Sequence, residues 1–268
     1  MSATRILALL RKELLDLSRT RAAIMPGLWT LLALVVPFVI AIGVPAVTGD
    51  KTVDRDITEA LDKVLKYWPE LEGLSGEART QAFFFQQFLM MLVLVPITGS
   101  MALAAYSIIG EKQARTLEPL LATPTTTAEI LVAKVLASFL PALLIEAIGI
   151  VLYFGGIGVM GAPGVLTALV SRRTALVLLL LAPLATLIAL QIVVIASSRV
   201  NDYRTAQQFG TLIVLPVVAV LIAQGTGAFW LTVPMILLAC GVLLVVWILL
   251  LLFGIAIFER EQILTRWK

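Results

Sequence analysis

Histidine is absent from this chain of 268 residues, and cysteine occurs once, as Cys240. Without histidine there is no zinc-peptidase motif and no Ser–His pair of a serine hydrolase. A single cysteine excludes a disulfide within the chain and a metal site built from cysteines. The chain also lacks the G-x-x-x-x-G-K-[S/T] loop that holds nucleotide phosphates. These absences argue against an enzyme, and they predict no catalytic residue, metal or cofactor in this chain.

Charged residues are also scarce. They make up 14% of the chain while 60% is hydrophobic, and the mean hydropathy is +1.02. Soluble domains contain about 25% charged and about 45–50% apolar residues. The composition therefore indicates a polytopic membrane protein. The net charge of +3 is too small to indicate a nucleic-acid partner.

Six apolar runs are long enough to cross a bilayer, which takes about 20 residues of helix. Because backbone groups in lipid must be hydrogen-bonded within their own segment, such runs predict helices. We therefore expect an all-α fold, with residues 1–268 forming a single transmembrane domain of six helices. Pro and Gly residues interrupt the segment 216–235, so whether this segment forms a re-entrant hairpin is an open question on the sequence. The six predicted spans are 24–47, 83–109, 128–157, 174–197, 206–224 and 230–258.

Most of the 20 Lys and Arg residues fall on the side of the predicted spans that carries both termini. Cytoplasmic loops are enriched in these residues, so we expect a multi-pass protein of the inner (cytoplasmic) membrane with both termini in the cytoplasm. Arg172 and Arg173 lie on the outer side and fit this topology least well. Charges recur through Asp16 to Arg21, so the N-terminus does not resemble a signal peptide.

Residues 1–23 contain an amphipathic segment that predicts a helix lying flat on the membrane lipid. Its polar face carries Arg11 and Lys12, whereas Glu13 falls inside the apolar arc. A carboxylate is costly in lipid, so we expect Glu13 to face protein or a water-filled notch. The helix is either a plain surface anchor or, through Arg11, Lys12 and Glu13, part of the grip on a partner.

The predicted extracellular loop, 48–82, contains a second amphipathic helix at 53–71, which Pro69 ends. It either caps an exit path or lies on the membrane surface and fills a long loop. Glu146 lies deep within the third span, and intramembrane acids are functional candidates. A proton or cation role is open for Glu146, as are the structural alternatives of a protonated group or a bond to a neighbouring helix. Lys134 lies nearer the cytoplasm, and we expect it to snorkel to the interface.

The stretch "IIGEKQARTLEPLLATPTTTAEILVAK" (108–134) links the second and third spans. Within it, Leu117, Leu120 and Leu121 recur at i, i+3 and i+4, which places them on one face of a short cytoplasmic helix. Pro124 ends that helix, and threonines follow as turn and cap residues. A turn that only reverses the chain needs no leucines, so this helix predicts a groove in a partner protein.

The same stretch resembles the type-2 ABC exporter permeases, the six-span membrane subunits of ATP-driven exporters. Their pattern has a charged cluster, then Thr-Leu-Glu, a leucine pair and Thr-Pro, and it stands here as "GEKQARTLEPLLATP" followed by "AEILVAK". Gln113 occupies a position where the family usually has a second acid. The segments 9–21, 197–210 and 258–268 also resemble family pieces in the right order. The residues that match the motif are Thr116, Leu117, Glu118, Leu120, Leu121, Thr123 and Pro124.

This resemblance implies a mechanism and partners. Two permease subunits would pair as a homodimer or heterodimer, and each would dock on a separate ATPase subunit that binds ATP and Mg. Residues 110–127 would form a coupling helix seated in the ATPase, and ATP binding would then move the spans. The leucines would supply the grip, while Glu111, Lys112, Arg115 and Glu118 would set register and partner choice.

Two other functions stay open on the sequence. A stand-alone channel or secondary transporter would favour several intramembrane charges and an internal repeat, whereas one charge and no clear repeat are found. A non-transporting membrane anchor or assembly subunit is the other alternative. Co-purification of an ATPase distinguishes the exporter permease from both, and the substrate is not indicated by the sequence.

Overall fold

The structure is a computed structural model that describes residues 3–18, 34–43, 61, 63–116 and 125–257. Within these ranges every regular element is a helix, which confirms the predicted all-α fold class. The principal elements are α1 (Ala3–Ser18), a short helix (Leu34–Gly43), η2 (Pro69–Leu71), α4 (Gly76–Gln113), α6 (Thr127–Met160), α7 (Val165–Leu169), α8 (Arg172–Leu176), η3 (Val177–Leu181), α9 (Ala182–Arg199), α10 (Tyr203–Gly210), η4 (Thr211–Ile213), α11 (Val214–Gly225) and α12 (Val233–Ile257).

Five of these helical runs are long and apolar enough to cross a membrane, and they confirm the last five of the six predicted spans. The first predicted span, 24–47, is described only in its helical part, Leu34–Gly43. The five runs are Gly76–Gln113, Ala128–Met160, Arg172–Arg199, Tyr203–Gly225 and Val233–Ala256.

Helix α4 is longer at both ends than the predicted span. It begins at Gly76 because the hydroxyl of Ser75 caps it, accepting a hydrogen bond from the amide of Ala78 at 3.3 Å. The charges of Glu77 and Arg79 masked this start in the hydropathy pattern. With 38 residues, α4 is about 57 Å long, nearly twice the hydrocarbon thickness of a bilayer. It therefore reaches well beyond the lipid core.

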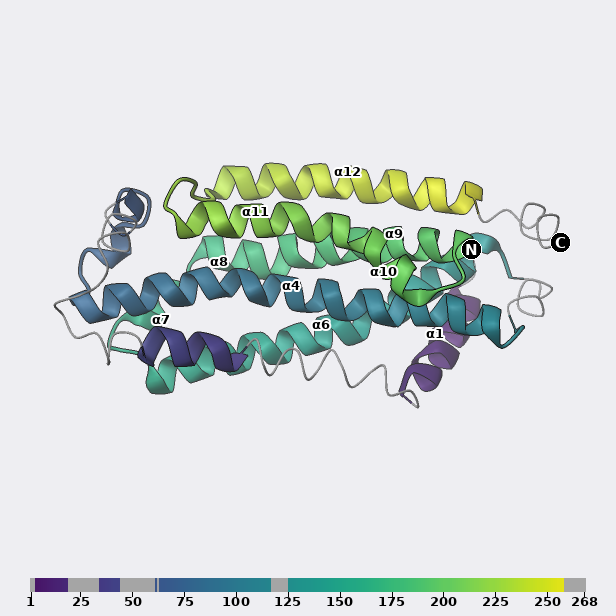
Figure 1. The fold of residues 1–268 in the computed structure, drawn as a ribbon, viewed down its shortest axis with the longest axis horizontal. Helices are drawn as coiled ribbons and strands as arrows, with labels where there is room; N and C mark the ends of the chain where they lie inside the picture. Colours follow the sequence, from purple (N-terminus) through teal and green to yellow (C-terminus); the bar gives the residue numbers. More distant parts are fainter. Residues whose placement is uncertain (1–2, 19–33, 44–60, 62, 117–124, 258–268) are drawn as a thin grey trace.

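The long helices run along the long axis of the molecule (Figure 1). One end carries α1, the last turn of α4 and the start of α6, and we call it the α1 end. The opposite end carries α7, α8 and the start of α4, and we call it the α7 end. Helix α4 is the central element, in contact with α6, α9, α10 and α11.

Helices α8, η3 and α9 form one continuous span that contains a π-helical turn. The π turn Val177–Leu181 ends two residues before Pro183. In a regular α-helix the proline ring would clash with the carbonyl four residues earlier, so the wider turn relieves that conflict. The predicted span 174–197 is thus present, with a local irregularity that hydropathy does not reveal.

The stretch 216–235 forms the junction of two separate helices. The run through α10, η4 and α11 covers Tyr203–Gly225, and α12 begins at Val233. Figure 1 shows α11 running toward the α7 end and α12 running back. The open question of a re-entrant hairpin is therefore answered by two full-length helices of opposite direction.

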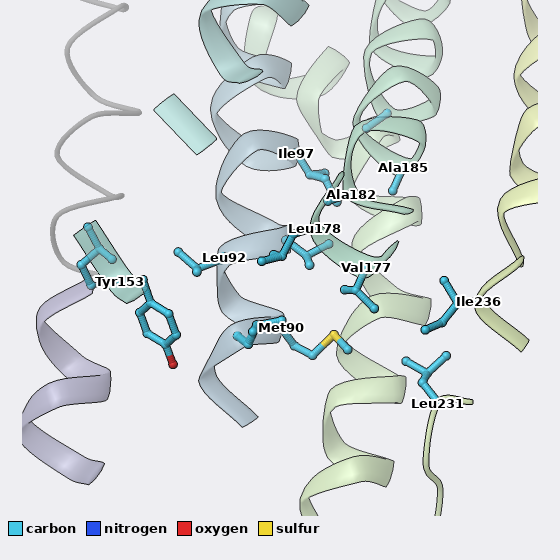
Figure 2. Close-up of a cluster of buried hydrophobic side chains, with 14 of the residues drawn as sticks. Met90, Leu92, Ile97, Tyr153, Val177, Leu178, Ala182, Ala185, Leu231 and Ile236 are labelled. Atoms are coloured by element: carbon cyan, nitrogen blue, oxygen red, sulfur yellow. The ribbon is translucent and has the colours of Figure 1, made fainter. Parts of the chain in front are cut away.

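Apolar side chains form one core along the central helices (Figure 2). In its most hydrophobic window α4 is 67% buried, whereas α12 is 11% buried. The outward faces of α12 and α6 instead expose leucines, valines and isoleucines, as expected for surfaces that contact lipid. The side chains of this core that Figure 2 labels are Met90, Leu92, Ile97, Tyr153, Val177, Leu178, Ala182, Ala185, Leu231 and Ile236.

The helix Leu34–Gly43 is held on α6 by aromatic contacts. The ring of Phe38 packs edge-on against Tyr153 at 5.9 Å and Phe85 at 5.3 Å between centroids. Gly156 makes this approach possible, because an added Cβ would lie 2.5 Å from the Phe38 ring. The hydroxyl of Tyr153 donates to the carbonyl of Phe85 at 2.6 Å, which ties α6 to α4 at this level.

Candidate functional site

Four charged side chains meet where α1, α4 and α6 come together at the α1 end. At their centre lies Lys134 of α6, which is 3% exposed. Its ammonium lies 3.1 Å from Glu13 Oε1 on α1 and 2.8 Å from Glu111 Oε2 on α4. It also donates to the carbonyl of Ser107 at 2.9 Å. Lys134 thus makes two hydrogen bonds and an ion pair with Glu111. We call Lys12, Glu13, Glu111 and Lys134 the ion network.

Lys12 completes the ion network from its solvent-facing side. Its ammonium lies 2.5 Å from Glu111 Oε1 and 3.2 Å from Glu13 Oε1. Burial alone would lower the pKa of Lys12, but the hydrogen bond to Glu111 and the charges of Glu13 and Glu111 outweigh it and raise the pKa above its usual value. Lys12 therefore stays charged at physiological pH, and two cations balance two carboxylates.

The ion network explains the placement of Glu13 and corrects the expectation for Lys134. Glu13 faces protein, as predicted, because Lys134 lies opposite it. Lys134 was expected to snorkel to the interface, and this is wrong: its side chain points inward and is enclosed by three helices. A buried charge that is paired with an opposite charge costs less free energy than a lone buried charge.

Local sequence positions the start of α6. Thr126 and Glu129 form a capping box, in which the Thr126 hydroxyl accepts from the Glu129 amide at 3.3 Å and Glu129 Oε2 accepts from the Thr126 amide at 2.9 Å. Arg5 of α1 lies 4.0 Å from the same Glu129 oxygen. The first turn of α6 is thereby connected to α1, one turn before Lys134.

Lys112 joins the last turn of α4 to the end of α9. Its ammonium donates to the carbonyls of Ser197 at 2.6 Å, Ser198 at 2.9 Å and Val200 at 3.0 Å. Carbonyls at a helix C-terminus lack partners within the helix and carry partial negative charge, so a lysine there is favourable. Glu111 and Lys112 thus point to different neighbours, and together they fix the end of α4 to α1, α6 and α9.

The chain leaves α4 through a left-handed turn. Ala114 ends the helix, and Arg115 has φ = 55°, a value that non-glycine residues rarely adopt. The amide of Thr116 closes the turn by donating to the carbonyl of Glu111 at 3.0 Å. This turn lies inside the predicted coupling helix 110–127, so the prediction is wrong at its start: residues 110–113 belong to α4, and the chain turns out of that helix at Arg115.

The structure brings some of the predicted site residues together and leaves others apart. Lys12, Glu13 and Glu111 belong to the ion network, Lys112 lies beside it, and Arg115 and Thr116 form the turn. Arg11 is exposed. The rest of the predicted coupling helix lies outside the described residues, namely Leu117, Glu118, Leu120, Leu121, Thr123 and Pro124.

Glu146 forms no part of this site. It lies twelve residues after Lys134, about 18 Å further along α6. Its side chain is buried, and neither carboxylate oxygen has a hydrogen-bond partner among the residues that the structure describes. The alternative of a bond to a neighbouring helix therefore has no partner in these ranges. In the same part of the chain, no three His, Cys, Asp or Glu side chains converge in a way that could hold a metal.

Sequence reasoning missed Lys134 as a member of the site. The available signal was Glu13, an acid inside the apolar arc of α1, because such a group requires a cation from another helix. Comparison with known proteins adds that the family model for the ABC-2 family transporter protein matches residues 7–237, a range that includes the whole ion network. No curated protein matches the chain.

Proposed function

Since the chain belongs to the ABC-2 transporter family and is a membrane-spanning permease subunit of an ABC transporter, we propose that it forms an exporter as one half of a permease dimer driven by separate ATPase subunits. The second permease subunit is either another copy or a related chain. In this proposal ATP and Mg are bound by the ATPase subunit, and the present chain supplies the substrate path.

The observation that supports the proposal is that the described residues on both sides of segment 117–124 are fixed to several helices. On its N-terminal side, Glu111 and Lys112 bind α1, α6 and α9. On its C-terminal side, Glu129 and Lys134 bind α1 and α4. Force applied to a turn so connected moves helices as rigid bodies and is not lost in local bending. A motor subunit that held this turn would therefore move several spans together.

Within this proposal the predicted coupling residues divide into two groups. Leu117, Leu120 and Leu121 seat in a groove of the ATPase subunit, and Arg115 and Glu118 set the register there. Glu111 and Lys112 act from inside the permease. The carboxylate of Glu111 already binds α1 and α6, and the ammonium of Lys112 binds the end of α9. Their part is to transmit the motion.

The α1 end is also the basis for the orientation and location that we propose for the chain. The α1 end faces the cytoplasm, where an ATPase subunit has access to it, and the protein lies in the cytoplasmic membrane. Helix α1 rests at the lipid interface with Arg11 exposed, and Lys and Arg residues on this side agree with the rule for cytoplasmic segments. No nucleic acid is involved.

The test is the double variant Leu117→Asp, Leu121→Asp in a strain that expresses the cognate ATPase subunit. We expect wild-type permease to co-purify with the ATPase in mild detergent and to change its rate of ATP hydrolysis. The double variant should insert normally but lose both effects, because two carboxylates do not enter an apolar groove. Val170→Asp is the matched control, since Val170 is an exposed apolar residue in a turn at the α7 end.

The outcomes separate this function from its alternatives. If the double variant retains the ATPase subunit and its rate of hydrolysis as Val170→Asp does, the turn is not the coupling element. If the wild-type permease purifies alone under conditions that preserve the complex of a known ABC transporter, a stand-alone transporter or an assembly subunit fits better. Loss of binding in both variants would point to a general folding defect.

A further inference from the structure

Three side chains from separate segments meet at the α7 end. Trp68 precedes η2, Arg173 lies in α8, and Trp230 lies in the turn before α12. The guanidinium carbon of Arg173 is 4.2 Å from the centroid of the Trp230 ring and 5.3 Å from that of Trp68. The two indole rings are 5.7 Å apart. We call these three residues the aromatic clasp.

The aromatic clasp is held by stacking of its three side chains, and the carboxylate of Glu70 adds an electrostatic attraction to Arg173. An arginine guanidinium is attracted to the face of an indole and lies flat on it better than a lysine does. The two indoles are almost fully buried, yet the Trp230 Nε1–H group has no acceptor among the described residues. A buried donor without an acceptor costs free energy. Opening the clasp would return the Trp230 Nε1–H group to water. The burial of this donor therefore lowers the stability of the closed arrangement.

The segment that carries Trp68 is attached differently at its other edge. Arg79 of α4 donates through Nε to the carbonyl of Leu71 at 2.9 Å and through Nη2 to that of Glu72 at 2.6 Å. Leu71 itself is fully buried. Hydrogen bonds from Arg79 therefore anchor Leu71 and Glu72 to α4. The main chain of Trp68 bonds to its neighbours Val64, Leu65 and Leu71, and its side chain makes the contact with α8 and with the segment before α12.

We propose that the segment Lys63–Leu71 is a latch over the α7 end, hinged where Arg79 holds it and closed by Arg173 on Trp68 and Trp230. The latch joins α8 to the start of α12, so movement of those helices strains the clasp, and the clasp opens to let cargo leave at this end. This step rests on the proposed export function. It also explains Arg173, the basic residue that fitted the predicted topology least well.

The first arm of the test compares two neighbouring arginines by hydrogen exchange in the complete protein in lipid nanodiscs. Arg173→Gln removes the clasp cation, whereas Arg172→Gln makes the same change of charge at an exposed side chain. We expect Arg173→Gln to speed exchange at the amides of residues 64–72 by about tenfold, the size expected from loss of one partly desolvated cation–π contact. Equal exchange in the two variants would overturn the latch.

The second arm locks the latch in the complex with the ATPase subunit. Cysteines replace Trp68 and Trp230 in a Cys240→Ala background, and a short bifunctional thiol reagent joins them. We expect the cross-linked complex to lose most of its ATP hydrolysis relative to two controls, the same double-cysteine complex left untreated and the same complex treated with a monofunctional thiol reagent. Cross-linked complex that hydrolyses ATP as fast as these controls would show that the clasp is only structural.

The two arms also separate the latch from the export function. Hydrogen exchange requires no transport activity, so it decides whether Arg173 closes the segment even if no ATPase subunit binds the chain. If exchange rises in Arg173→Gln but the wild-type chain never affects an ATPase, the export function fails and the latch remains as a structural element.

Discussion

Replacing Lys134 by methionine should destabilise the protein more than any other single change at the α1 end. Methionine matches the length of the lysine stem but leaves Glu13 and Glu111 with one shared cation, Lys12. Both carboxylates are largely buried: the exposed fraction of the side chain is 5% for Glu13 and 11% for Glu111. Removing one partner from a buried ion pair costs about 3–5 kcal/mol, because the charge that remains has lost its compensation.

The matched control is Lys12→Met, which removes a cation from the same ion network. The Lys12 side chain is 45% exposed, so water screens its interactions, and Glu111 keeps its contact with Lys134. Exposed ion pairs contribute about 1 kcal/mol or less. We therefore expect Lys12→Met to lower the free energy of unfolding only slightly, although the number of charges removed is the same.

The assay is reversible denaturation in mixed micelles, with the free energy of unfolding measured for each variant. A double variant, Lys134→Met with Glu13→Gln, should be less destabilised than the two single changes added together, by about 2 kcal/mol, since the residues contact each other directly. If Lys134→Met is no more harmful than Lys12→Met, or if the double variant is simply additive, the ion network does not hold α1, α4 and α6 together.

Two further changes test other parts of the chain. The Glu146→Gln variant should insert into the membrane, and its complex should hydrolyse ATP at the wild-type rate at every pH examined. The reason is that the substitution keeps the shape of a side chain whose oxygens accept no hydrogen bond in the described residues. A loss of activity, or a changed pH profile, would give Glu146 a proton or cation role. Asp202→Ala should speed hydrogen exchange at the Thr205 amide, which donates to the Asp202 carboxylate at 3.0 Å, whereas Asp202→Asn should preserve protection, since asparagine also caps helices well. The bonds from Thr205 lower the pKa of Asp202, so its stabilisation is complete at neutral pH and is lost as the pH falls through that lowered value. Unchanged protection in Asp202→Ala would show that the cap is not needed.

The sequence determined the membrane architecture because the bilayer acts on each segment separately. Five predicted spans are present as helices, and the first is helical over its described residues. Lipid imposes the same requirement on every span, namely enough apolar residues and internally satisfied backbone groups, so hydropathy over a window identifies the helices. Boundaries were less well predicted. Capping by Ser75 and the continuation to Gln113 extend α4 into polar sequence that a hydropathy criterion rejects.

The turn motif was also readable, since it is a continuous stretch with its own charge and leucine pattern. What that pattern could not indicate was which side chains turn inward. Glu111 and Lys112 are adjacent in sequence and equally polar, yet Glu111 binds α1 and α6 while Lys112 binds the end of α9. The direction each side chain takes depends on which helices surround α4, and those neighbours come from distant parts of the chain.

Lys134 and Arg173 mark what only the tertiary structure decided. On sequence alone, Lys134 was a cation near the interface and Arg173 a basic residue on the unexpected side of the membrane. Each is explained by partners far along the chain: Glu13 lies 121 residues before Lys134, and Arg173 is enclosed by Trp68 and Trp230. A buried charge is stable or unstable according to its partners, and the partners are set by how the helices pack, which no local window of sequence contains.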